Sequence, residues 1–188
     1  VAYSSASGEF TIDSSVSRIG SCAFNGSNIT SLIIPATVTE IEWEAFSNCA
    51  YLETVDIRAN IGTIPEWAFC WCRNLKSITI PASVERIQDC AFINCQSLTD
   101  IRISGNNFIV KDNAIYTADE TTLVAYPTAS GSVEIPETVK TIRAGAFAGS
   151  LVESITIPAT VTAIESEAFS QCELLYSISI PETVTSIG

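Results

Sequence analysis

The dipeptide Ala-Phe recurs at a nearly fixed interval, and this repeat constrains the fold more than any other feature of the chain. The six pairs have spacings of 22, 23, 23, 55 and 22 residues and end at Phe24, Phe46, Phe69, Phe92, Phe147 and Phe169. A fixed period in the twenties is typical of a solenoid, in which each repeat packs only against its neighbours. Every other residue can therefore be interpreted by its position relative to these phenylalanines.

Several other positions follow the same period. A proline stands eleven residues before four of the phenylalanines, an apolar residue stands eight before all six, and isoleucine stands five before all six. The unit is I-x-I-P-x-x-V-x-x-I-x-x-x-A-F-x-x-C-x-x-L-x-x. The alternating, β-branched run "SITIP" at 77–81 predicts a short strand that a proline closes, and its equivalents predict a parallel sheet on one face. The Ala-centred stretches "EWEAF" and "PEWAF" predict short helical or 3₁₀ turns on the other face.

One segment interrupts the period. The spacing of 55 residues exceeds a 23-residue unit by 32. Residues 104–133 carry the apolar runs "FIV", "AIY" and "TLVAY", separated by polar residues that favour turns. We expect an irregular inserted repeat that is structured, within a single repeat domain over residues 1–188. Because the chain does not begin with Met and ends midway through a repeat, we also expect it to be a fragment of a longer protein.

Four of the seven cysteines occupy one repeat position, three residues after the phenylalanine: Cys49, Cys72, Cys95 and Cys172. This regularity favours a ladder of buried thiols, because free cysteine is among the most buried residue types. A disulfide and a metal or redox site are the alternatives. The chain has no histidine, and Cys70 and Cys72 form a single Cys-x-Cys pair, whereas zinc sites use two convergent pairs. We predict no metal and no cofactor, and leave open whether any cysteines pair.

Charge and hydropathy exclude several classes of protein. The net charge is −12, and the nine basic residues are scattered, whereas nucleic-acid binding needs a basic stripe. No apolar run approaches the roughly 18 residues of a membrane span, so direct membrane insertion is not expected. A serine or cysteine nucleophile would lack a histidine base. We therefore predict that the protein is not an enzyme.

The repeat unit, together with the insert "NNFIVKDNAIYTADETTLVAYP", resembles the BspA-like leucine-rich repeats of bacterial and protist surface proteins. The resemblance runs from Phe10 to Gly188. It implies a leucine-rich-repeat solenoid, a right-handed coil with a parallel sheet on one face and turns and loops on the other. It also implies an extracellular or cell-surface location and a binding function that includes adhesion to host or matrix proteins.

Two groups of residues are candidates for binding, because they vary between repeats and so are not dictated by the fold. The first points outward from the strands, on what we expect to be the exposed concave face of the sheet. It comprises Ile33, Asp56, Thr79, Arg102, Glu134, Thr156 and Ser179, flanked by Glu53, Lys76, Glu153 and Tyr176. Solenoids commonly bind partners through such a face. The alternative is a face that is merely solvated.

The second group is aromatic. Trp43, Trp67 and Trp71 lie in two adjacent repeats, at positions where other repeats carry mainly polar or small residues. Exposed tryptophan is a favoured anchor for proteins and sugars. Alternatively, the three rings fold back over the turns and cover them.

These observations leave three hypotheses. The first is a non-catalytic extracellular module that binds a host or matrix protein through the strand face. The second is a carbohydrate-binding surface module that uses the tryptophans. The third is a passive spacer in a multidomain surface protein.

Overall fold

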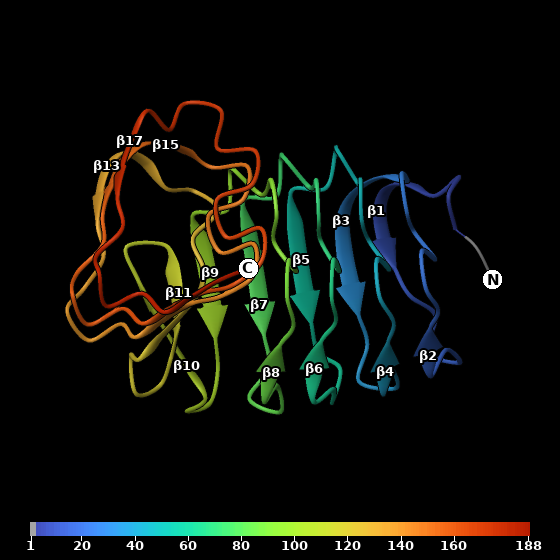
Figure 1. Ribbon diagram of the computed structural model, residues 1–188. Helices are drawn as coiled ribbons and strands as arrows, with labels where there is room; N and C mark the ends of the chain where they lie inside the picture. Colours follow the sequence, from blue (N-terminus) through green and yellow to red (C-terminus); the bar gives the residue numbers. More distant parts are fainter. Residues whose placement is uncertain (1–2) are drawn as a thin grey trace.

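The computed structural model describes residues 3–188, which form a solenoid of short, mostly parallel strands (Figure 1). The strands of the first long sheet lie side by side in chain order, one from each coil. They are β1 (Ser7–Thr11), β3 (Asn28–Ile34), β5 (Thr54–Ile57), β7 (Ser77–Ile80) and β9 (Asp100–Ile103). A second sheet of the same kind contains β13 (Ser130–Glu134), β15 (Leu151–Thr156) and β17 (Ser177–Ser179). The predicted repeat solenoid with parallel sheets is confirmed.

Each coil adds a two-residue strand on another side of the solenoid. The pairs are β2 (Arg18–Ile19) with β4 (Glu40–Ile41) and β6 (Thr63–Ile64) with β8 (Arg86–Ile87). In the second half, β14 (Thr141–Ile142), β16 (Ala163–Ile164) and β18 (Ser186–Ile187) continue a sheet that begins with an antiparallel segment, β10 (Phe108–Lys111), β11 (Ala114–Thr117) and β12 (Thr122–Ala125). We call residues 3–103 the first arm, residues 104–125 the connecting hairpin and residues 126–188 the second arm.

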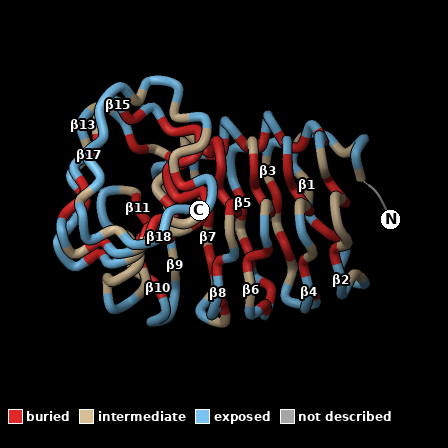
Figure 2. Tube along the Cα trace, in the orientation of Figure 1, coloured by how far each residue is buried: buried red, intermediate tan, exposed pale blue. Residues whose placement is uncertain are grey.

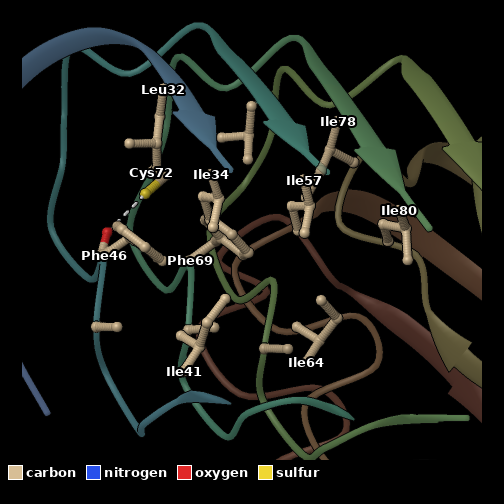
Figure 3. Packing of buried hydrophobic residues seen from close by; sticks show 14 of the residues in the cluster. Leu32, Ile34, Ile41, Phe46, Ile57, Ile64, Phe69, Cys72, Ile78 and Ile80 are labelled. Atoms are coloured by element: carbon tan, nitrogen blue, oxygen red, sulfur yellow. Dashed lines mark hydrogen bonds between the residues drawn. The ribbon is translucent and has the colours of Figure 1, made fainter. Parts of the chain in front are cut away.

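The core runs along the inside of both arms. Strand side chains alternate between buried and exposed, as in β7, where Ile78 and Ile80 are buried and Thr79 is partly exposed. The alternation is visible along the tube in Figure 2. Since equivalent isoleucines and leucines stack from coil to coil, each coil buries its apolar face only against its neighbours (Figure 3).

The phenylalanines of the Ala-Phe pairs form a continuous column in the first arm. Ring centroids are 5.3 Å apart between Phe24 and Phe46, 5.3 Å between Phe46 and Phe69, and 5.8 Å between Phe69 and Phe92, and all three pairs are stacked. All four side chains are at most 3% exposed. A single repeat could not bury its phenylalanine alone, so the column explains why these rings recur at one position.

The turns around the phenylalanines are hydrogen-bonded from coil to coil. The backbone N–H of Phe24 donates to Ala45 O at 2.8 Å, and the residues two before and two after it donate to the same neighbouring turn, from Cys22 to Trp43 O and from Gly26 to Ser47 O. The same three bonds join the next coils. This set, which we call the turn ladder, pairs backbone groups as a sheet does although the residues are in turns.

The turns are not helical, and that part of the prediction is wrong: residues 3–188 contain no helix. The reason is the backbone conformation two residues before and two after each phenylalanine. All twelve of these positions have φ between 54° and 73°, namely Cys22, Gly26, Glu44, Asn48, Trp67, Trp71, Cys90, Asn94, Gly145, Gly149, Glu167 and Gln171. A left-handed residue cannot continue a right-handed helix. Instead, except in the last of these turns, the backbone N–H of each left-handed residue points to the next coil, where it donates a hydrogen bond.

The connecting hairpin is a wedge between the cores of the two arms. Successive side chains of a strand point to opposite faces, and β11 and β12 are buried on both. Phe108, Ile115 and Val124 belong to the core of the first arm. Ala114, Tyr116 and Leu123 belong to the core of the second arm. The wedge separates the two long sheets, so that β13, β15 and β17 are turned away from the row of β1 to β9 (Figure 1).

The turn ladder crosses this junction although the long sheets do not. Cys90 N donates to Ala144 O at 3.3 Å, and Asn94 N donates to Ala148 O at 3.1 Å. Ala146 O, the acceptor that the next turn would offer to Phe92, accepts instead from Tyr126 N at 2.6 Å. Residues far apart in sequence are therefore joined on the turn side and held apart on the strand side, which bends the solenoid.

Two glycines test how tightly this junction is packed. Gly26 and Gly149 occupy equivalent left-handed positions, with φ of 69° and 73°. A Cβ on Gly26 meets nothing within 4 Å, whereas a Cβ on Gly149 would overlap the Asn94 carboxamide. We expect Gly26→Ala to lower the free energy of unfolding by about 1 kcal/mol, the cost of a left-handed alanine. Gly149→Ala should cost about 2–4 kcal/mol, because overpacking adds to it. Urea unfolding of both variants measures the difference, and equal losses would contradict a close-packed junction.

Candidate binding surfaces

The outward strand residues predicted from the repeat lie on the exposed faces of the long sheets. In the first arm the register pairs Ile33 with Asp56, Asp56 with Thr79, and Thr79 with Arg102 on adjacent strands. Glu134 pairs with Thr156, and Thr156 with Ser179, in the second arm. The seven residues therefore form two rows on two separate sheets, and not the one row that the sequence suggested.

The face of the first arm, which we call the strand face, carries three ion pairs. Arg58 Nε lies 2.7 Å from Asp56 Oδ2, and Arg102 Nη2 lies 2.8 Å from Asp100 Oδ2. Lys76 Nζ lies 2.8 Å from Glu53 Oε2 on the adjacent coil. The side chains in these pairs are 38–71% exposed, so each pair contributes little to folding stability. Both signs of charge are therefore held in place and remain accessible.

Hydroxyl groups fill the space between these charges. Thr54 Oγ1 donates to Ser31 Oγ at 3.0 Å in the first arm, and Ser154 Oγ donates to Ser132 Oγ at 2.8 Å in the second arm. Small hydroxylated side chains leave the sheet open to close approach. The outward residue Ile33 is only partly exposed, so the strand face is polar with little apolar area.

Tyr176 lies beside the row of outward residues in the second arm, at the repeat position that Glu53 and Lys76 occupy in the first. It precedes β17, its backbone N–H donates to Glu153 O at 3.0 Å, and its side chain is 76% exposed. Leu174, Ile178 and Ile180 nearby are 37–49% exposed. The last coil therefore has an apolar edge in addition to its strand residues.

The three tryptophans are in different environments. Trp43 is 53% exposed, and Tyr51, which follows it in the same repeat, is 59% exposed. Trp67 and Trp71 are only partly exposed and pack against a small cluster of Cys70, Cys90, Ile93, Ala144 and Ala148 at the junction of the arms. These two rings thus cover the turns, which leaves Trp43 as the exposed tryptophan among the three.

Both junction tryptophans are held by neighbouring polar groups. Trp67 Nε1 donates to Glu66 Oε1 at 2.8 Å. The Arg73 guanidinium lies over the Trp71 ring, 4.6 Å from its centroid, within the range of a cation–π contact. Since Arg73 occupies that face of Trp71, the face is not open for stacking against a sugar.

A polar pocket of about 140 Å³ lies beside Trp71 where the two arms meet, lined also by Asn94, Gln96 and Gln171. Asn94 Nδ2 donates to Gln171 Oε1 at 2.8 Å, and Gln96 Nε2 donates to Gly149 O at 2.6 Å. Asn94 is 4% exposed. The amides are thus already paired across the junction, and they join the arms.

The cysteines of the shared repeat position form the expected ladder. The thiols of Cys49, Cys72, Cys95 and Cys172 each donate to a phenylalanine carbonyl of the preceding coil at 3.1 Å. Figure 3 shows this bond from Cys72 to Phe46 O. The two coils without this cysteine have Ser27 and Ser150 there, and both hydroxyls contact the next thiol. The position therefore requires a small side chain with a donor.

All seven cysteines are free in the part of the chain that the structure describes, and that part has no cluster of three or more His, Cys, Asp or Glu side chains that could hold a metal ion. Burial raises the pKa of the Cys70 and Cys90 thiols to about 12. Smaller contributions come from Cys90 and Glu44 for Cys70, and from Glu167 and Asp89 for Cys90. Burial also raises the pKa of Cys95. Thiols that stay protonated at neutral pH are poor nucleophiles and poor metal ligands.

The architecture defines the class of protein. The chain matches solved leucine-rich-repeat structures over nearly its whole length. Against a leucine-rich repeat protein from Eubacterium ventriosum it has 29% identity and a TM-score of 0.75, covering 96% of this chain and 55% of that one. Against a leucine-rich repeat protein from Bacteroides ovatus it has 23% identity and a TM-score of 0.57, covering 95% of this chain and 50% of that one. This chain therefore spans about half the length of either protein.

The sequence pattern identifies the family within that class. The BspA type leucine rich repeat region matches residues 2–121 and 127–188, in six copies. The chain belongs to this family, as the repeat unit predicted. A comparison with curated proteins gives no match.

Within residues 3–188, no helix has the length and apolar character that crossing a bilayer requires.

The buried thiols predict a specific pH dependence of stability. In the unfolded chain the thiols of Cys70 and Cys90 ionise near pH ~8.5, whereas in the folded chain burial raises their pKa to about 12. Because only the unfolded state releases these protons between the two values, the contribution of the two thiols to the free energy of unfolding should be constant from pH 7 to about pH 8 and fall above about pH 9. Urea midpoints from pH 7 to 10.5 under reducing conditions measure this. The double variant Cys70→Ala/Cys90→Ala should decline less steeply, and an equal slope would contradict the assignment.

Proposed function

We propose that the protein is a non-catalytic extracellular module that binds another protein through the strand face of the first arm, at a cell surface. The observation that carries the proposal is the accessible array of both charges on that face, around Asp56, Thr79 and Arg102. Membership of the BspA-type family and the resemblance to surface proteins support it. A host or matrix protein is the partner class that this resemblance implies.

The composition of the strand face favours a protein over other ligands. Interfaces between proteins that also exist separately are about as polar as the rest of the surface and rely on complementary charge for specificity and for fast association. The strand face presents paired charges and hydroxyl groups along a sheet, which suits a broad partner surface better than a small molecule. The solenoid holds the residues on rigid strands, so little conformational entropy is lost when they bind.

The second arm extends the surface in a second direction. Glu134 and Thr156 lie on β13 and β15, on the sheet that is turned away from the first. A partner that contacts both rows must therefore follow the bend. We assign Glu134, Thr156 and Tyr176 to a secondary contact region, and Asp56, Thr79 and Arg102 to the primary one.

A carbohydrate ligand is the alternative, and one observation favours it. Trp43 is 53% exposed and no side-chain hydrogen bond to it is seen in residues 3–188, so its ring is available for stacking on a sugar. Trp67 and Trp71 are used in the junction and contribute less to this hypothesis. The spacer hypothesis predicts no ligand for this chain.

Binding to arrays of extracellular-matrix proteins and glycans tests the three hypotheses together. For a protein hit, we expect Arg102→Glu to weaken binding by at least about tenfold, since a reversed charge opposes the partner's complementary potential. Thr79→Arg should have a similar effect, because a large side chain blocks close approach to the sheet.

Arg86→Glu is the matched control. Arg86 is also exposed but lies on β8, away from the strand face, and its reversal should leave the affinity within about twofold. A protein hit that survives both strand-face variants refutes the proposed surface. A glycan hit that Trp43→Ala abolishes favours the carbohydrate module, and the absence of any hit favours the spacer.

A further inference from the structure

The pattern Tyr-x-x-Ala-Ser-Gly occurs twice, at residues 3–8 and 126–131, an offset of 123 residues. The match continues beyond it: Val16 and Ile19 correspond to Val139 and Ile142, and Phe24 corresponds to Phe147. It also includes the two residues before the tyrosine, because Val1-Ala2 is repeated as Val124-Ala125. Each copy begins one arm.

The two copies make the same local structure. Tyr3 N donates to Ala23 O at 2.6 Å, and Tyr126 N donates to Ala146 O at 2.6 Å. Each tyrosine also packs on the phenylalanine of its coil, with centroids 4.8 Å apart in the first arm and 5.7 Å in the second. Both first strands carry an irregularity after the glycine, at Gly8/Glu9 and at Gly131/Ser132. The beginnings of the two arms are therefore equivalent in sequence and in local structure.

At the second arm, the connecting hairpin covers this end. Strand β12 pairs in parallel with β14. Thr121 O accepts from Lys140 N at 2.8 Å and Thr141 N at 3.2 Å, and Leu123 O accepts from Arg143 N at 3.0 Å. On the same side, the Leu123, Tyr116 and Ala114 side chains join the core of the second arm.

At the first arm, residues 3–188 provide no such cover for the equivalent donors. Ser17, Arg18 and Gly20 correspond to Lys140, Thr141 and Arg143. Their backbone N–H groups have no acceptor among residues 3–188. Within the described part of the chain, the outer edge of β2 is therefore unpaired, and such an edge can pair with a further strand.

An apolar cavity lies beside that edge. It has a volume of about 90 Å³ and is lined by Tyr3, Ile12, Val16, Arg18, Ile19, Gly20, Ala23 and Phe24. Six of these eight residues are identical at the equivalent positions of the second arm, the exceptions being Arg18 and Gly20. Val16 is only partly buried, whereas its counterpart Val139, beneath the hairpin, is fully buried. The first arm thus has an uncovered copy of a surface whose occupant is visible elsewhere in the same chain.

We infer that the end of the first arm, formed by Tyr3, Val16 and β2, is a docking surface for a β-hairpin of the kind formed by β11 and β12, carried by a further arm of this repeat type. The hairpin would offer two backbone carbonyls to Ser17, Arg18 and Gly20. It would also place a leucine against Val16 and Ile19, as Leu123 lies in the core with Val139 and Ile142. This inference concerns how arms join, and it does not depend on the proposed function.

A fusion tests the docking surface directly. Residues 106–123 are copied in front of Val1, so that the copied Leu123 precedes Val1 as the native Leu123 precedes Val124. In the copy, Phe108→Thr and Ile115→Thr make the hairpin's other face polar, since no further arm covers it. We expect hydrogen exchange of the Ser17, Arg18 and Gly20 amides to slow by at least about 100-fold relative to the unfused chain, because each gains a buried acceptor.

The fusion contains its own references. The Lys140, Thr141 and Arg143 amides should stay protected in every variant, which shows that the chain is folded. A control fusion with Leu123→Asp in the copied hairpin should leave the three test amides unprotected. Equal exchange in the unfused chain and the fusion overturns the inference. Protection in the unfused chain that grows with protein concentration also overturns it, because a second copy is then the occupant.

Discussion

The hydrogen bonds between successive turns are the constraint on which the rest of the structure depends. Because the residues two before and two after each phenylalanine have φ between 54° and 73°, their N–H groups point along the solenoid axis and reach the next turn. The conformation costs roughly 1 kcal/mol or more for a side chain other than glycine. The turn ladder offsets this cost by pairing backbone groups that would otherwise be buried without partners. The phenylalanine between each pair of left-handed residues is thereby directed into the core.

The bend follows from the same ladder. The connecting hairpin widens the strand side by inserting β10 to β12, while Cys90 and Asn94 bond directly to Ala144 and Ala148 on the turn side. The turns can approach this closely because Gly145 and Gly149 have no Cβ, which would contact Cys90 and overlap Asn94 respectively. Thus the glycines at these two positions serve two purposes: they adopt the left-handed conformation and they leave room for the preceding coil. Trp67 and Trp71 then cover the compressed side of the junction.

Much of the fold could be predicted because comparing the repeats shows which positions keep the same kind of residue. The isoleucines at 19, 41 and 64 recur in one column, and a column of apolar residues must be buried in a stack. The pattern predicts the wrong turn conformation because alanine before phenylalanine favours helix locally. The contrary signal is at the flanking positions, where Asn48 and Gly26 are residue types that tolerate left-handed φ. Ser27 and Ser150 belong to the thiol column although their residue type differs, because serine and cysteine are both small side chains with a donor. The division of the outward row between two sheets follows from the geometry of the connecting hairpin. The repeat columns carry no information about that geometry.

The duplicated start of each arm changes how the binding residues should be considered. Within one arm, adjacent strands are held in register by the ladder, so Asp56, Thr79 and Arg102 keep a fixed spacing. Between arms, the spacing and the angle depend on the hairpin, whose two faces must fit the end of one core and the beginning of the next. Substitutions in the strand rows therefore alter the chemistry of a face, whereas substitutions in the hairpin alter the direction in which the next face points. A repeat protein built this way can change the shape of its surface without changing the strands that contact a partner.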